Sequence, residues 1–412
     1  MNQRINFFLV LSMLFISASS SSISTSTIFV LFISIITLLL FALKNIKIDN
    51  FFIFFTVAYF LLSLIYFLKF EYVDILYIFY FYTLLMYAYM TIKIVGYDFF
   101  IIYHNIVYFL SLISIPFFIL QLIMFDTMFD FVGFFQKLIP FLSYKNDVFA
   151  NNFLFTIEKG AIYRNSGFAW EPKGFSNFLI LAILINTNLY SFKMNKQLVV
   201  FFIALMTTFS TVGYVILFTA FTLYLSINRK INTRFIFPLI IFIISIIISS
   251  SDFIYKKIYR EVYTMNEQAD MIYDRRYFKS RSLGRFGSLL IDYNDFLKHP
   301  LLGYGIQRKE SSFKQLRTVS KYNDTKLVRV NGFSDRLVSF GLMGMIFYLF
   351  AIYKSFENYF KYYNTKGAIV IVFMFLLIEF ATTLTTDPFW MIFLFLFLIK
   401  DNAIKNSKFN NV

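Results

Sequence analysis

Cysteine is absent from the 412 residues, and histidine occurs only twice. The lack of cysteine excludes disulfides, thiolate metal sites and cysteine nucleophiles, so any chemistry must come from other side chains. Charged residues are also scarce, at 15%, while 59% of the residues are hydrophobic and the mean hydropathy is +0.68. Soluble domains are roughly 45 to 50% apolar, so this composition excludes an ordinary soluble core and predicts a polytopic membrane protein.

Apolar runs recur along the whole chain, and many approach the roughly 20 residues that cross a bilayer. Since a bilayer offers backbone groups no hydrogen bonds, these runs predict an all-α fold of about twelve transmembrane helices. The first run follows Arg4 and ends in small residues like a signal peptide, but a second span follows closely. We expect helices at residues 6–20, 27–43, 51–68, 75–95, 99–125, 175–190, 198–209, 212–227, 235–250, 333–353, 367–386 and 388–400.

Along the chain, connections between expected helices that are rich in Lys and Arg alternate with connections that carry few or none. KNIK (44–47), KMNK (193–196) and NRKINTR (228–234) are basic, whereas turns such as FSTVG (209–213) and TTDP (385–388) carry no Lys or Arg. Cytoplasmic loops are enriched in Lys and Arg, so both termini are expected in the cytoplasm.

Two polar segments, residues 126–174 and 252–332, are too long to be turns, and the alternation places both on the outer face. The first contains MFDFVGFFQKLIPFL (128–142), whose aromatic face suits a helix lying in the membrane interface. The expected organisation is one medium and one large outer loop between three groups of helices. Its boundaries are 1–125 (helices one to five), 126–174, 175–250 (helices six to nine), 252–332, and 333–412 (helices ten to twelve with the tail).

The larger outer segment is strongly basic, with 16 Lys and Arg against 9 Asp and Glu, and the whole chain carries a net charge of +15. Such a loop can simply touch anionic lipid headgroups. Alternatively, its guanidinium groups can bind a diphosphate bidentately and stabilise it as it leaves. The candidates for this second role within the segment are Arg275, Arg276, Lys279, Arg281 and Arg285.

The stretch RNSGFAWEP (164–172) precedes the sixth expected helix. Pro172 suits a first helical turn and Glu171 suits the positive end of the helix dipole, which explains both as a helix start. Arg164 and the turn containing Gly167 are not needed for that. We therefore consider Arg164 a diphosphate ligand and Glu171 the first candidate to activate an acceptor hydroxyl or to orient an arginine.

Two further stretches combine glycines with ionisable residues. In HPLLGYG (299–305), Pro300, Gly303 and Gly305 indicate a turn, and His299 is either a turn residue or a weaker catalytic candidate. In NGFSDRLVSFGLMG (331–344), Asn331 opens the tenth helix, while Asp335 is a catalytic candidate or forms an ion pair with Arg336. The spaced glycines of this stretch, Gly341 and Gly344, indicate close helix packing. His104, Glu379 and Asp387 admit both structural and functional interpretations.

These stretches, in this order, resemble the superfamily of O-antigen polymerases and O-antigen ligases, which are bacterial inner-membrane glycosyltransferases. RNSGFAWEPKGFSNFLIL (164–181) is similar to the family's Arg and Gly followed by Glu-Pro at a helix entry. FSTVGYVILF (209–218) resembles a Ser/Thr-Gly segment, FLKHPLLGYG (296–305) the family's most recognisable motif, and NGFSDRLVSFGLMG the helix after it. The resemblance covers about residues 150 to 350.

The resemblance implies a GT-C-like glycosyltransferase of the bacterial inner membrane that needs no metal or other cofactor. Its substrates would be undecaprenyl-diphosphate-linked oligosaccharides at the periplasmic face. Membrane lipids and a chain-length regulator are further candidate partners, and nucleic acid is not one. Val330 stands where ligases of this type carry a histidine, and Glu-Pro at 171–172 is similar to the polymerase version, so polymerase is favoured over ligase. A lipid-linked oligosaccharide flippase is the alternative from another class.

Overall fold

The structure is a computed structural model that describes residues 2–19, 21, 24, 26–71, 74–140, 143–159, 163–191, 193–228, 285–306 and 331–399. Within these residues the chain is almost entirely helical. The helices are α1 (Asn2–Ala18), α2 (Thr27–Leu43), α3 (Asn50–Phe70), α4 (Ile75–Val95), α5 (Asp98–Ile123), α6 (Phe125–Leu138), α7 (Pro172–Leu189), α8 (Lys196–Thr207), α9 (Thr211–Asn228), α13 (Arg285–Lys298), α15 (Gly332–Tyr362), α16 (Ala368–Ala381) and α17 (Pro388–Met391), followed by the short 3₁₀ turns η1 (Ile392–Leu394) and η2 (Leu396–Leu398).

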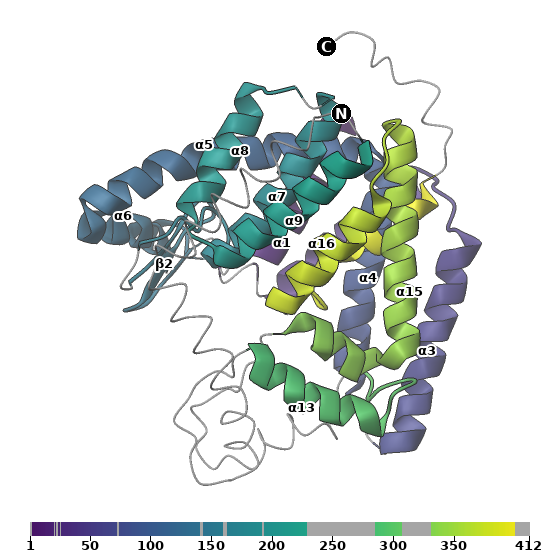
Figure 1. Ribbon diagram of the computed structural model, residues 1–412. Coiled ribbons are helices and arrows are strands. Elements are labelled where there is room, and N and C mark those ends of the chain that lie inside the picture. The colour runs from purple at the N-terminus through teal and green to yellow at the C-terminus, as the bar shows by residue number, and fades with distance from the viewer. Residues whose placement is uncertain are drawn as a thin grey trace.

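Four of the described helices, α3, α4, α5 and α15, are long and apolar enough to cross a membrane. Shorter apolar helices pack beside them, including α2 against α4. Helix α16 likewise packs against α15 (Figure 1). Large aromatic side chains such as Tyr87, Phe99 and Phe356 fill the interior of the bundle. This arrangement is that of a helical membrane protein, because its exposed surface is also rich in large apolar side chains.

Eleven of the helices expected from the sequence fall on described residues, and a helix is found at each. The expected helix at 235–250 lies outside the described residues. The last two are shorter than expected, because the chain is extended at Thr382 and restarts at Pro388, and the segment after α17 continues only as 3₁₀ turns. The proline lacks a backbone N–H and fits a helix start, so α17 begins at the last residue of the predicted turn TTDP.

Helix α15 is broken at Gly341, whose φ of 63° lies in the left-handed region. We call residues 332–340 the short arm of α15 and residues 342–362 its long arm. The HPLLGYG loop docks onto this break through its backbone: the Tyr304 N–H donates to Val338 O (2.8 Å), and the Leu342 N–H donates to Pro300 O (2.8 Å). The loop therefore supplies hydrogen bonds that an unbroken helix would make within itself.

The short arm and α13 lie side by side across one end of the bundle, which we call the α13 end (Figure 1). At a different side of the molecule, α6 packs on a small antiparallel sheet of order β1 (Tyr144–Lys145), β2 (Phe149–Asn151) and β3 (Thr156–Glu158). Met128 and Val132 of α6 are buried, whereas Phe131 and Phe134 are exposed. The segment expected to be amphipathic is thus a helix with two distinct faces.

Candidate functional site

The short arm of α15 begins with a polar cluster that ties it to α13. Asn331 caps the helix, since its side chain accepts a hydrogen bond from the Ser334 N–H (3.2 Å). The Ser334 hydroxyl in turn donates to Asp292 Oδ2 of α13 (2.6 Å). All three side chains are buried, so this contact fixes the two helices to one another in an environment where unpaired polar groups are costly.

One turn along, Arg336 forms a buried ion pair with Glu379 of α16. Arg336 Nε lies 3.1 and 3.3 Å from the two carboxylate oxygens, and Nη2 also donates to Oε1. The guanidinium carbon lies 3.8 Å from the centre of the Tyr348 ring. Sequence reasoning offered an Asp335–Arg336 pair instead, but adjacent residues on a helix point in different directions. Among the described residues none accepts a hydrogen bond from Arg336 Nη1.

Two more carboxylates lie at the turn between α16 and α17. Asp335 faces this turn, where the Thr385 hydroxyl lies 3.5 Å from Asp335 Oδ2. Asp387 caps α17 through its backbone and makes no hydrogen bond through its side chain with any described residue. Burial raises the pKa of Asp387 to about 7, so its proton can be gained or lost near neutral pH.

The start of α7 approaches the same region from another side. Glu171 is the N-cap residue of α7, and its carboxylate pairs with Lys173 Nζ (2.9 Å). The same amine donates to Ala381 O at the end of α16 (3.0 Å). Glu171 therefore stands next to the cluster, but it is already engaged by a lysine.

Arg164 Nη2 lies 3.6 Å from Glu158 Oε2 of β3, and both side chains are partly exposed. Between Arg164 and Glu171 the chain reverses at Gly167, whose φ is +49°. A Cβ there would lie 2.8 Å from the Phe175 ring, so the turn requires glycine. Arg164 is thus paired with Glu158 and Glu171 with Lys173, and the hypothesis that Glu171 activates an acceptor hydroxyl or orients an arginine stays a prediction.

His299 lies beyond the other end of the cluster, where α13 meets α3. Its Nδ1 is 2.9 Å from Lys69 Nζ, and its ring packs edge-on against Phe70 and Tyr304. Partial burial and the charges of Lys69 and Lys298 lower the pKa of His299. The neutral imidazole accepts a hydrogen bond from Lys69, which is the behaviour of a positioning residue.

The two glycines of the same loop are both required by close approach. Gly303 has a φ of +72°, and a Cβ there would lie 2.5 Å from Val338 O of the short arm. Gly305 has a φ of +76°, and a Cβ there would lie 2.8 Å from the Tyr66 ring of α3. The loop is therefore held between α15 and α3, and larger residues would force it away from both.

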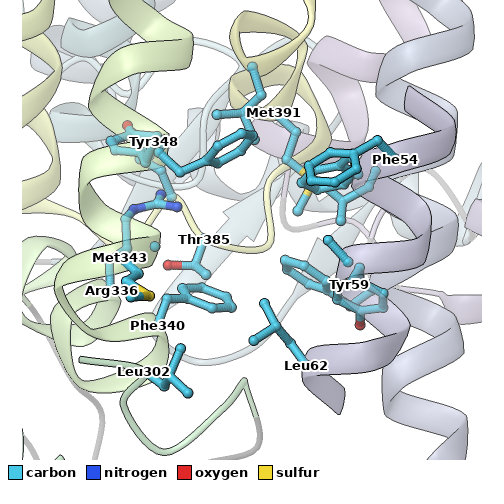
Figure 2. A pocket seen from close by; sticks show the side chains of 18 of the residues that line it. Phe54, Tyr59, Leu62, Leu302, Arg336, Phe340, Met343, Tyr348, Thr385 and Met391 are labelled. Carbon is cyan, nitrogen blue, oxygen red and sulfur yellow. The ribbon is translucent and has the colours of Figure 1, made fainter. Parts of the chain in front are cut away.

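A pocket of about 270 Å³ lies between α3 and α15, next to the cluster. Figure 2 shows Phe54, Tyr59 and Leu62 of α3 facing Arg336, Phe340 and Met343 of α15 across this space. The rest of the lining is mostly apolar, and its polar groups are the indole N–H of Trp390 and the hydroxyl groups of Tyr59, Tyr66, Tyr348 and Thr385. An elongated, mostly apolar pocket suits an apolar ligand, since the guanidinium in its wall is already paired with Glu379.

The structure thus brings Glu171, Asn331 and Asp335 toward the end of α16, and it places Arg164 and His299 on separate sides of that region. Arg275, Arg276, Lys279 and Arg281 lie outside the described residues, and Arg285 begins α13, its side chain undescribed. Across the part of the chain that is described, no group of three or more His, Asp or Glu side chains is arranged to hold a metal ion.

Sequence reasoning gave little weight to Arg336, Glu379 and Asp387. A signal was available, because ionisable residues within apolar runs are rare and are functional candidates by default. No protein-family model matches the chain, and no curated protein matches it significantly. Function is therefore inferred from the geometry above and from the resemblance of the motifs.

Proposed function

We propose that this protein is a GT-C-type polymerase of surface polysaccharide, which joins undecaprenyl-diphosphate-linked oligosaccharides at the outer face of the bacterial inner membrane. The observation that carries the proposal is the juxtaposition of an apolar pocket with a cluster of carboxylates at the α13 end. A lipid-linked sugar has the same division, since its chain is apolar and its reacting end is polar. The four motifs of the resemblance also meet near this end or in the helices that support it.

The charges assign the two substrates to different parts of the site. The described cluster is acidic, with Asp292, Asp335 and Asp387 in addition to the neutralised Arg336–Glu379 pair. A diphosphate would be repelled there, whereas an acceptor hydroxyl needs a carboxylate to take its proton. The diphosphate is assigned to basic side chains of the segment 252–332, as the sequence predicts.

Within the cluster, Asp387 is the first candidate for the base. Glu171 is held by Lys173, whereas the Asp387 carboxylate makes no described hydrogen bond and has a pKa near the pH at which it would act. In the reaction, the acceptor oxygen attacks the anomeric carbon of the donor glycan while Asp387 takes the hydroxyl proton. The bond between the anomeric carbon and the phosphate oxygen breaks, and the diphosphate leaves with the electron pair.

The direct test is to incubate the purified protein in lipid nanodiscs with lipid-linked repeat units and to separate the products by size. Wild-type protein should form dimers and longer products without an added metal. Asp387→Asn should reduce the rate by about 10² to 10⁴-fold, the usual contribution of a general base, and Glu171→Gln should reduce it less. Wild-type activity should rise with pH through about 7. Full activity of the Asp387→Asn protein would remove this residue from the mechanism.

A flippase for the same lipid-linked units is the second candidate. It is favoured by the break in α15 beside a buried ion pair, because discontinuous helices at charged sites are a feature of transporters. The same nanodisc assay decides between them. A flippase moves the lipid-linked unit across the membrane without forming a new glycosidic bond, so no product larger than the substrate would appear.

A further inference from the structure

We propose that the pocket between α3 and α15 binds a segment of the polyprenyl chain of the lipid carrier, and that the chain enters it sideways from the bilayer past α3. This inference rests on the proposed function for the identity of the chain, and on the geometry of the pocket for its place. The polyprenyl chain, which is the apolar half of the substrate, is thereby assigned to named residues of the pocket. The carboxylate cluster at the α13 end would contact only the polar half of the substrate.

The pocket has the shape of a channel for a chain. Its lining residues on α3 run from Phe51 to Tyr66, which is about 22 Å of helix at 1.5 Å rise per residue. Its volume of about 270 Å³ is slightly below the range of roughly 300 to 1,000 Å³ that is usual for sites enclosing a whole small molecule. A narrow, long space of this size holds a length of hydrocarbon chain and excludes an oligosaccharide.

The lining gives sugars almost nothing to bind. Phe54, Ala58 and Leu62 on one wall face Phe340 and Phe347 on the other, and such surfaces leave hydroxyl groups without hydrogen bonds. The main polar exceptions are the Thr385 hydroxyl and the Arg336 guanidinium, which lies beside the Tyr348 ring and is already paired with Glu379 (Figure 2). A carrier lipid can therefore lie with its chain along α3 between these walls. Its diphosphate would remain outside the pocket, where the proposed function assigns it to basic side chains of the segment 252–332.

Helix α3 is hydrogen-bonded to α4, whereas it meets α15 only through apolar and aromatic side chains. Toward α4, the Tyr59 hydroxyl donates to Ile78 O (3.0 Å) and Thr56 bonds to Tyr82 (3.0 Å). Toward the long arm of α15, its contacts are aromatic, as between Phe55 and Phe347 (5.7 Å between ring centres). Within the described residues no hydrogen bond joins α3 to α15, so these two helices can separate without leaving polar groups unsatisfied.

At the α13 end, a latch closes the gap between the two helices. We define the latch as the hydrogen bond from the Tyr66 hydroxyl to Leu302 O and the contact between Lys69 and His299. Both contacts join α3 to the loop that docks on the break in α15. Opening the latch would expose the full length of the pocket to the bilayer from the side.

The experiment uses undecaprenyl phosphate without sugar, carrying a photoactivatable diazirine on its chain, with the full-length protein in nanodiscs. Wild-type protein should be labelled on α3 and on the long arm of α15. Ala58→Trp fills the pocket from α3 and should reduce labelling by at least about tenfold. Met343→Trp fills it from α15 and tests the same point if the first variant folds poorly. The matched control is Leu61→Trp, which adds the same ring to the exposed face of α3 and should leave labelling unchanged.

The outcomes separate this inference from the proposed function. Labelling that both tryptophan variants abolish supports the pocket, even if the wild-type protein forms no polymer from lipid-linked repeats. Polymer formation by wild-type protein with undiminished labelling of both pocket variants would overturn the pocket and leave the enzyme intact. Equal labelling by a diazirine phospholipid would also overturn the proposal, because the pocket would then be a general lipid site.

Discussion

The two helical walls of the pocket differ in how they are held. Helix α3 is the more hydrophobic, with a mean hydropathy of 2.4, yet only 6% of its apolar window is buried. Helix α15 has a mean hydropathy of 1.7, and 39% of its window is buried. The short arm that precedes this wall is fixed by an ion pair, a cap and a docked loop. Polar contacts therefore fix the short arm of α15 to its neighbours, whereas α3 is hydrogen-bonded to α4 and to the 299–305 loop but not to α15, which leaves α3 as the side that can move.

Joining the two walls covalently should have the largest effect. The chain has no cysteine, so the double variant Tyr66→Cys, Leu302→Cys can be joined specifically with a short bismaleimide. If the carrier chain enters between α3 and α15, the joined protein should lose almost all polymer formation, measured as the product ladder in nanodiscs.

A second double variant controls for the effect of the bismaleimide cross-linking reaction itself. Thr56→Cys, Tyr82→Cys joins α3 to α4 on the side that already carries hydrogen bonds, and it should keep its activity. Full polymer formation by the protein joined at 66 and 302 would show that α3 need not move.

Breaking the fixed wall should cost the most stability. Replacing one partner of the buried pair, as in Arg336→Met or Glu379→Leu, leaves an unpaired buried charge and should destabilise by about 3 to 5 kcal/mol. The double variant Arg336→Met, Glu379→Leu should recover most of this loss, because two apolar residues then pack together. The measurement is the thermal unfolding midpoint in detergent.

The matched control for the buried pair is an exposed pair on the same helix. Lys354 lies 2.9 Å from Glu357 at the surface of the long arm. Lys354→Met should leave the midpoint unchanged, since exposed pairs contribute little. A midpoint for Arg336→Met equal to that of Lys354→Met would mean that the ion pair does not hold the wall.

The docked loop can be tested at one glycine. Gly341→Ala places a Cβ 2.3 Å from Leu301 O at a φ of +63°, so both the backbone strain and the clash act. Gly96→Ala has nearly the same φ, +65°, but its Cβ would meet open space. Strain alone costs about 1 to 2 kcal/mol, so Gly341→Ala should lower the unfolding midpoint clearly further than Gly96→Ala. Equal midpoints would argue against the docking of HPLLGYG on the break.

The mobile and fixed walls also show what sequence reasoning could reach. The membrane-spanning helices were predictable, because long uninterrupted apolar runs such as that of α3 are stable in a chain of this composition only when they cross a bilayer. The break of α15 at Gly341 was not predictable, because the sequence GLMG is equally typical of close helix packing. Only the contacts with the distant loop at 300–304 decide between a break and an unbroken, closely packed helix. In the same way, Arg336 and Glu379 are 43 residues apart, and no local pattern connects them. Glu171, Asn331 and Asp335 were each predicted at or near a helix start, but their approach to the end of α16 comes from the structure.

The smallest effect concerns the latch on the mobile wall. Since the pKa of His299 is lowered in the folded protein, the neutral ring contributes stability above its ordinary pKa, and this contribution is lost as the pH falls through the lowered value. Protonation would place a positive ring 2.9 Å from Lys69, with Lys298 nearby and only Asp295 to offset them. The site is partly exposed, so the change in stability should stay below about 1 kcal/mol. The unfolding midpoint of wild-type protein should fall slightly more between pH 8 and pH 5 than that of His299→Gln, which keeps an acceptor for Lys69 but cannot be protonated. Parallel curves for the two proteins would remove His299 from the latch and leave Tyr66 to close the pocket alone.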